Sequence, residues 1–181
     1  MSTEEKRLRF GRESNMYQVG DRVVYGIHGV CRVVSIEERI VDHKKVIYLV
    51  LEPLGQGGSR YLVPTHNEAA MAKLRGMLTP EELKGMLDSG RDDHAAWIGE
   101  ENRRKQTYRE LLSAGRLEPI IPMIRTLYLH KQTQFAAGKK VHLCDDNFLR
   151  DAERLVAGEL AIGMDISLQE ALAYLRDQLN G

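Results

Sequence analysis

Met16-Tyr-Gln-Val-Gly-Asp-Arg-Val-Val-Tyr25 is followed directly by Gly26-Ile-His-Gly-Val-Cys-Arg-Val-Val-Ser-Ile36, and this stretch decides the fold of the N-terminal part of the chain. Its apolar residues alternate with polar ones, which indicates short β-strands, and its glycines indicate sharp bends between them. Two further runs of the same kind occupy residues 45–51 and 59–64. Four or five strands in so short a stretch predict a strongly bent SH3-like or Tudor-like small β-barrel.

The apolar spacing changes near residue 65 from the period of a strand to that of a helix. Helices are expected at residues 66–75, 79–87, about 95–114, 117 to about 134, 145–162 and from Ser167 to Leu179. Ser167 and Glu170 have the spacing of a capping box, in which each side chain bonds to the other residue's backbone N–H. The fold class predicted is therefore α+β with two domains, an N-terminal barrel over residues 16–78 and an all-α domain over residues 79–181, after a disordered lead-in over residues 1–15.

Composition limits where the protein works and what it binds. The 181 residues contain no apolar run long enough to span a bilayer, and the charged N-terminus does not resemble a signal peptide. Cys31 and Cys144 have neither disulfide-framework nor metal-ligand spacing. We therefore expect a soluble cytoplasmic protein with no membrane partner.

The formal net charge of zero conceals an uneven distribution of charge. Residues 103–150 carry ten Lys or Arg against four acids, a net charge of +6, whereas residues 151–181 have a net charge of −4. The first segment is suited to a nucleic-acid partner, although an ordinary solvated helical surface could have the same imbalance.

Motifs for catalysis are missing from the sequence. There is no Walker loop, no G-x-S-x-G and no H-E-x-x-H, and the stretch Gly55-Gln-Gly-Gly58 lacks the Lys-Ser/Thr of a phosphate loop. The six histidines are scattered without acidic partners at metal-ligand spacing. We expect a protein that is not an enzyme and that uses no metal or small-molecule substrate.

The sequence Val19-Gly-Asp-Arg-Val-Val-Tyr-Gly-Ile-His-Gly-Val30 resembles the opening of the CarD family, whose barrel also occurs in transcription-repair coupling factors. Further similarities are Ile36-Glu-Glu-Arg39, Tyr48-Leu-Val-Leu51 and, more loosely, the order of the helices up to residues 152–161. The resemblance implies a bacterial transcription regulator that is associated with the nucleoid through RNA polymerase and needs no cofactor. Its barrel would bind the polymerase β subunit, and its helical domain would contact promoter DNA at the upstream edge of the bubble and stabilise the open complex.

The resemblance also suggests residues for polymerase binding. Arg39 occupies the position of a family arginine that contacts the β subunit, and Leu62 stands where the family has a second arginine. Arg60, two positions before Leu62 and so on the same strand face, can substitute for it. Tyr48 and Tyr61 are further candidates, although strand tyrosines also serve simply to pack a barrel.

The candidate DNA contacts surround the one tryptophan of the chain. In the family the corresponding Trp enters DNA at the upstream fork, and an indole suits a partly unstacked base step. Trp97 is the candidate wedge here, although a lone Trp is more often a core anchor. The family's basic residues follow the Trp closely, but here residues 98–102 intervene. The expected sequence-independent contacts, through the backbone or the minor groove, are Arg103, Arg104, Lys105 and Arg109.

Two alternatives stay open at the level of sequence. One is a polymerase-binding module that does not contact DNA, which Glu100 and Glu101 favour because they would repel phosphate. The other is a KOW-like or Tudor-like protein that binds RNA or the ribosome, since small barrels host many functions.

Overall fold

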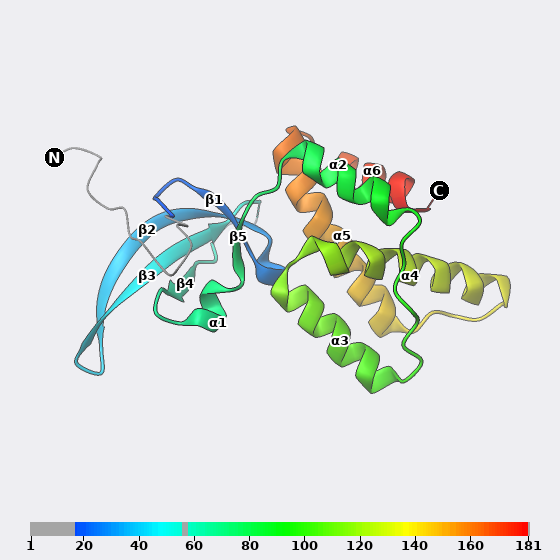
Figure 1. Ribbon diagram of the computed structural model, residues 1–181, viewed down its shortest axis with the longest axis horizontal. Helices are drawn as coiled ribbons and strands as arrows, with labels where there is room; N and C mark the ends of the chain where they lie inside the picture. Colours follow the sequence, from blue (N-terminus) through cyan, green and yellow to red (C-terminus); the bar gives the residue numbers. More distant parts are fainter. Residues whose placement is uncertain (1–16, 56–57, 181) are drawn as a thin grey trace. The chain divides into compact units, whose positions relative to one another are not determined.

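The computed structural model describes residues 17–55 and 58–180. The chain divides into two compact units, residues 1–77 and residues 78–181. The boundary lies one residue before the expected one, and the expected lead-in over residues 1–15 lies outside the described residues. The predicted α+β class is confirmed, with strands in the first unit and helices in the second (Figure 1).

The first unit is built on one antiparallel sheet with the strand order β4-β3-β2-β1-β5. The strands are β1 (Arg22–Tyr25), β2 (Val30–Val41), β3 (Lys44–Pro53), β4 (Tyr61–Pro64) and β5 (Leu74–Gly76). Strands β4 and β5 are the two edges, so the sheet is barrel-like but not closed. A 3-10 turn, η1 (Gly26–His28), joins β1 to β2.

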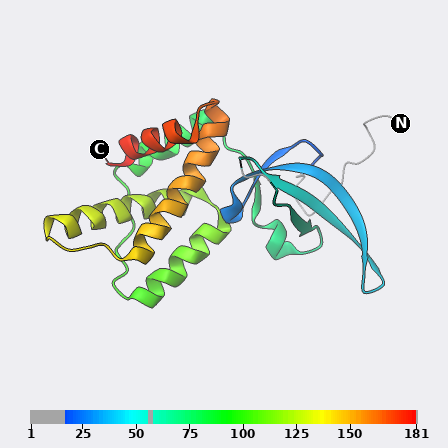
Figure 2. The same ribbon diagram turned by 180° about the vertical axis from the view of Figure 1, so that it is seen from behind.

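The longest feature of the sheet is the β2–β3 hairpin, which curves away from the other strands in both views (Figures 1 and 2). Asp42 and His43 form its turn with φ of 49° and 61°, as a two-residue hairpin loop with two left-handed residues requires. The register shifts between Val33 and Ser35, and such a bulge bends the strand that contains it.

Helix α1 (Glu68–Met71) is shorter than the helix expected over residues 66–75. Asn67 caps it, since its side chain accepts a hydrogen bond from the backbone N–H of Ala70 at 3.0 Å. The chain then forms edge strand β5, which pairs with β1. The core of this unit consists of inward-facing residues from all five strands: Val23, Cys31, Val33, Leu49, Leu51, Val63 and Leu74.

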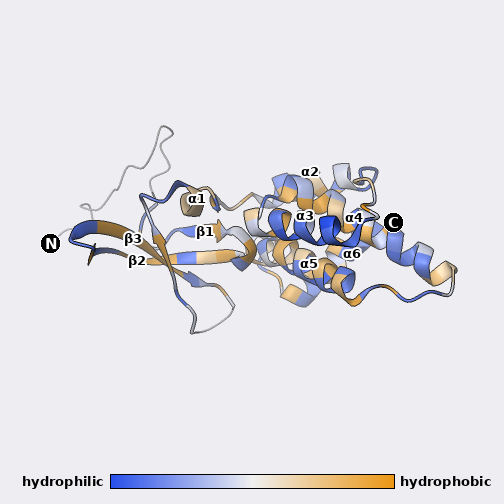
Figure 3. Cartoon of the chain, turned by 90° about the horizontal axis from the view of Figure 1, so that it is seen from below, coloured by the Kyte–Doolittle hydropathy of each residue, from blue (hydrophilic) through white to orange (hydrophobic). Residues whose placement is uncertain are grey.

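The second unit contains helices α2 (Pro80–Gly90), α3 (Glu101–Ala114), α4 (Leu117–Ala136), α5 (Leu143–Met164) and α6 (Leu168–Asn180). Their apolar faces share one core to which every helix contributes, α4 and α5 most of all. Helix α3 is mostly hydrophilic along its length in Figure 3. Within the described ranges, no helix has both the length and the apolar content needed to cross a membrane.

Local capping explains where several helices begin. The predicted capping box is confirmed, because the backbone N–H of Ser167 donates to Glu170 and that of Glu170 donates to the Ser167 hydroxyl. Helix α3 begins at Glu101, six residues after the expected start. Glu100 caps it, because its carboxylate accepts hydrogen bonds from the backbone N–H groups of Asn102 and Arg103, each at 2.8 Å. Trp97 therefore lies before the helix, in an irregular segment.

Candidate functional sites

The first site is the sheet surface around Arg39, here called the arginine face and defined as Glu37, Arg39, Tyr48, Glu52 and Arg60. The Arg39 guanidinium donates to Glu37 Oε2 at 2.6 and 3.0 Å, and its central carbon lies 5.9 Å from the centre of the Tyr48 ring. Tyr48 pairs with Glu37 across the β2–β3 ladder. The structure thus brings Arg39 and Tyr48 together, and half of the Arg39 side chain stays exposed.

Arg60 belongs to the same face. Its guanidinium lies 3.3 Å from Glu52 on the neighbouring strand. Hydrogen bonds from Arg39 and Ser35, followed by the charges of Arg39 and Arg60, hold the pKa of Glu37 below its usual range. The face therefore presents two exposed guanidinium groups, each paired with a carboxylate: Arg39 with Glu37 on β2, and Arg60 with Glu52 on β3, the neighbour of edge strand β4.

The expected place of Tyr61 beside Arg39 and Arg60 at the polymerase-binding surface is corrected by its orientation. Successive residues of a strand point to opposite sides of a sheet, so Tyr61 points away from the side of Arg60 and Leu62. Its half-buried ring packs against the core, 4.0 Å from the ring centre of His28 and 6.1 Å from that of Tyr25. Tyr61 therefore supports the interior of the sheet and does not belong to the arginine face.

In the second unit, Trp97 is half-buried and packs against the helical core. Its ring stacks on His130 of α4, with centroids 3.5 Å apart and planes 10° apart. The Arg104 guanidinium lies over the indole at 4.5 Å. The residues next to Trp97 in the sequence form no apolar face that it could join, but His130 and Arg104 hold its ring in place. In this conformation the indole is therefore not free to insert between bases.

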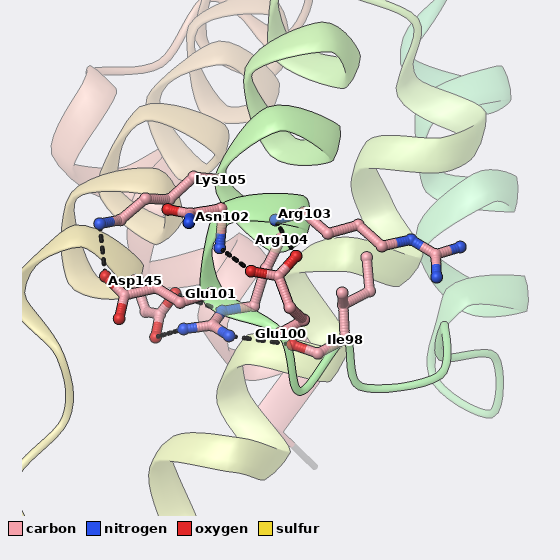
Figure 4. A network of polar contacts seen from close by, with 8 residues as sticks. All are labelled: Ile98, Glu100, Glu101, Asn102, Arg103, Arg104, Lys105 and Asp145. Atoms are coloured by element: carbon pink, nitrogen blue, oxygen red, sulfur yellow. Dashed lines mark hydrogen bonds and ion pairs between the residues drawn. The ribbon is translucent and has the colours of Figure 1, made fainter.

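The expected role of Arg104 as a phosphate contact is also corrected, because the residue is only 3% exposed and cannot meet a phosphate in solvent. Its guanidinium donates to both carboxylate oxygens of Asp145, at 2.9 and 3.1 Å, and to the carbonyl of Ile98 at 2.9 Å (Figure 4). Asp145 is 1% exposed. The hydrogen bonds that Arg104 donates to Asp145 raise the pKa of the guanidinium further, so Arg104 stays charged while it links α3, α5 and the Trp97 segment.

The three other cations expected at the DNA contact differ in availability. Figure 4 shows the Arg103 side chain pointing away from the buried pair, and both Arg103 and Arg109 are exposed. Neither has an ion pair among the described residues. Lys105 is partly buried and pairs with Glu101 one turn earlier. Arg103 and Arg109 are thus the cations of α3 that remain open to an anionic partner.

Two features of this site have no local signal in the sequence. Asp145 lies 41 residues from Arg104, and the Thr126 hydroxyl donates to the carbonyl of Ala95 at 2.8 Å, 31 residues away. The first positions the guanidinium that also bonds to the Ile98 carbonyl, and the second bonds directly to the irregular segment before α3. They depend on tertiary packing, which the spacing of residue types does not encode.

The described ranges hold no cluster of three or more side chains suited to a metal ion. Burial raises the pKa of Cys31 to about 11, so its thiol stays protonated at neutral pH and is a poor nucleophile.

The family comparison agrees with the strand pattern. Residues 17–75 match the family described as "CarD-like/TRCF RID domain", and the match runs from just before β1 into β5. This domain type interacts with RNA polymerase. Residues 17–75 of this chain therefore belong to the CarD-like family with its RNA polymerase-interacting domain, and the chain is a transcription-related protein.

Proposed function

We propose that this protein regulates bacterial transcription by docking its N-terminal unit on the β subunit of RNA polymerase and presenting its helical unit to promoter DNA at the upstream edge of the bubble. The observation that carries the proposal is the exposed Arg39 of the arginine face, on a domain of a polymerase-interacting family. The RNA-binding alternative has no comparable support.

The docking mode follows from the position of the arginine face. Strand β4 is an edge, and an edge strand offers backbone N–H and C=O groups to a strand of a partner. Main-chain hydrogen bonds would supply much of the affinity, and Arg39 and Arg60 would add specificity for a complementary acidic surface.

The DNA side of the proposal uses the open cations of α3. Arg103 and Arg109 can reach phosphates but not read bases, so the contact is independent of sequence. Tethering to polymerase raises the local DNA concentration and compensates for a weak contact. A helical unit that prefers the melted fork to closed duplex would shift the equilibrium toward the open complex by that difference in affinity.

Arg39→Glu is expected to weaken binding to the isolated β subunit about tenfold or more. The substitution places a carboxylate beside Glu37 and opposite a surface that is complementary to arginine, and like charges in an interface repel. Binding is measured by titrating labelled full-length chain with β subunit. The matched control is Lys45→Glu, which reverses an exposed charge paired with Glu38 in the same hairpin. Equal binding by both variants would remove Arg39 from the interface.

For the helical unit, Arg103→Gln and Arg109→Gln are each expected to weaken duplex binding by the full chain. Each should also reduce the slope of log Kobs against log salt concentration by about 0.9, which is the loss of one phosphate contact. Lys84→Gln on α2, exposed but distant in sequence from α3, is the control and should leave the slope unchanged. The slopes come from anisotropy titrations at several salt concentrations. Wild-type slopes in both α3 variants would exclude this helix as the DNA contact.

A second candidate function is a polymerase-binding module that does not contact DNA. The burial of Arg104 and the packing of Trp97 favour it, since they leave two fewer groups for DNA than the sequence suggests. Under this alternative, Arg39→Glu abolishes regulation, whereas removal of the α3 cations changes neither DNA binding nor open-complex lifetime. The two variant sets therefore separate the functions.

A further inference from the structure

A surface groove lies among α4, α5 and α6, on side chains that the proposed polymerase and DNA contacts do not use. It encloses about 390 Å³. Helix α4 contributes Tyr128, Lys131, Gln132 and Phe135, α5 contributes Asp146, Leu149, Arg150 and Glu153, and α6 contributes Arg176 and Asn180.

The acidic groups of the groove are already engaged. Glu153, 5% exposed, accepts a hydrogen bond from the Tyr128 hydroxyl at 2.5 Å and two from the Arg176 guanidinium at 2.7 and 2.9 Å. Burial alone would raise the pKa of Glu153, but these hydrogen bonds outweigh it and hold the pKa below its usual range. Asp146 accepts a hydrogen bond from Lys131 at 2.8 Å. The carboxylates therefore anchor cations and add little negative charge at the surface.

The rim, in contrast, carries open positive charge and an open aromatic ring. Arg150 is exposed and has no ion pair in the parts of the chain that the structure describes. The Arg176 side chain keeps 53% of its surface exposed despite its bond to Glu153. Phe135 is 64% exposed, with the Lys131 ammonium 6.0 Å from the centre of its ring.

We propose that this groove binds single-stranded nucleic acid, with one base stacked on Phe135 and the adjoining phosphates held by Arg150 and Arg176. An exposed ring flanked by cations is the combination that single-strand binding surfaces use, because every base has a face to stack and every linkage carries a charge. Duplex DNA keeps its base faces covered and cannot use Phe135 in this way. An acidic peptide with an apolar anchor would need an enclosed apolar pocket, whereas this groove is open and lined by polar and apolar groups alike, and its Tyr128 and Glu153 groups already bond to each other.

This inference deepens the proposed function, on which it rests for the source of the strand: a regulator bound to polymerase meets single-stranded DNA where the promoter melts. The groove and α3 are expected to bind different ligands, the groove a single strand and α3 the backbone of a duplex. Failure of one can therefore be observed without failure of the other.

The test is an anisotropy titration of a labelled oligothymidine of about 12 nucleotides, within the usual site sizes of single-strand binding folds, with full-length chain at several salt concentrations. Phe135→Ala is expected to weaken binding about 5- to 150-fold, the range for loss of one stacked base, with an unchanged salt slope. Arg150→Gln is expected to lower the slope by about 0.7, the value for one phosphate of a single strand.

Two matched controls accompany these variants. Leu168→Ala removes an exposed apolar side chain at the start of α6, and Arg116→Gln removes an exposed cation at the opposite end of α4, about 28 Å along the helix from Phe135. Both are expected to bind the oligonucleotide as the wild type does. Wild-type affinity for the oligonucleotide in Phe135→Ala would overturn the proposal. A parallel titration with poly-glutamate identifies the other occupant. If the variant loses binding to poly-glutamate and keeps binding to the oligonucleotide, the groove holds an acidic protein segment and the proposal is overturned. Failure of the proposed function would appear separately, as unchanged β-subunit binding by Arg39→Glu.

Discussion

Replacing Asp145 with alanine is expected to destabilise the helical unit by about 3–5 kcal/mol, the usual cost of removing one partner of a buried ion pair. The carboxylate is 1% exposed and satisfies two hydrogen bonds of the Arg104 guanidinium. Without it the guanidinium stays buried and charged, since arginine does not deprotonate in proteins. It must either remain without its main partner or leave the interior and take its bond to the Ile98 carbonyl with it.

Urea unfolding followed by tryptophan fluorescence measures this effect, because the only tryptophan of the chain lies in the helical unit. Asp146→Ala is the matched control: it removes the adjacent carboxylate, whose pair with Lys131 is about one-third exposed on each side, and should cost no more than about 1 kcal/mol. The double variant Arg104→Met/Asp145→Leu should recover most of the lost stability, because replacing both ions with apolar groups leaves no buried charge. Equal midpoints for the two single variants would mean that Arg104 is free in solution and available to DNA.

The strands and the helix spacing could be predicted from the sequence because they depend on short-range alternation and capping. Ser167 and Glu170 lie three residues apart, and their mutual hydrogen bonds are the ones that this spacing predicts. The start of α3 could not be placed so well, since Glu100 is an unusual N-cap residue. Strand β5 is three residues long and has no pattern of its own; it forms because β1 offers an edge.

The residues of the candidate sites likewise divide into those whose place follows from local pattern and those whose place depends on distant contacts. Arg39 and Tyr48 lie together because strand pairing brings them onto one face, and the same alternation, applied to Arg60 and Leu62, already excludes Tyr61 from it. The burial of Arg104 could not be predicted from the sequence, because its partner Asp145 lies 41 residues away on another helix. A charge pattern alone does not distinguish an arginine that faces solvent from one that faces a buried carboxylate.

Trp97→Ala is expected to destabilise the helical unit by about 2–3 kcal/mol, somewhat below the 3–5 kcal/mol of a fully buried tryptophan, because the ring is only half-buried. The variant loses the stacking on His130 and the contact with the Arg104 guanidinium. Burial lowers the pKa of His130, so that imidazole is mostly neutral at pH 7 and stacks as an uncharged ring.

The measurement is thermal unfolding followed by circular dichroism of the helices, since the variant has no tryptophan to observe. Trp97→Phe is the control: it keeps a ring against His130 and should lose roughly half as much stability. The expectation differs if the indole makes no contacts in the unbound protein and inserts into DNA. Trp97→Ala would then cost almost no stability, and the effect of the protein on open-complex lifetime would disappear. An unchanged melting temperature in Trp97→Ala, together with a shortened open-complex lifetime, would therefore return Trp97 to the DNA contact. A lowered melting temperature with full regulation below it would make the residue an anchor, and contact with promoter DNA would then depend on Arg103 and Arg109.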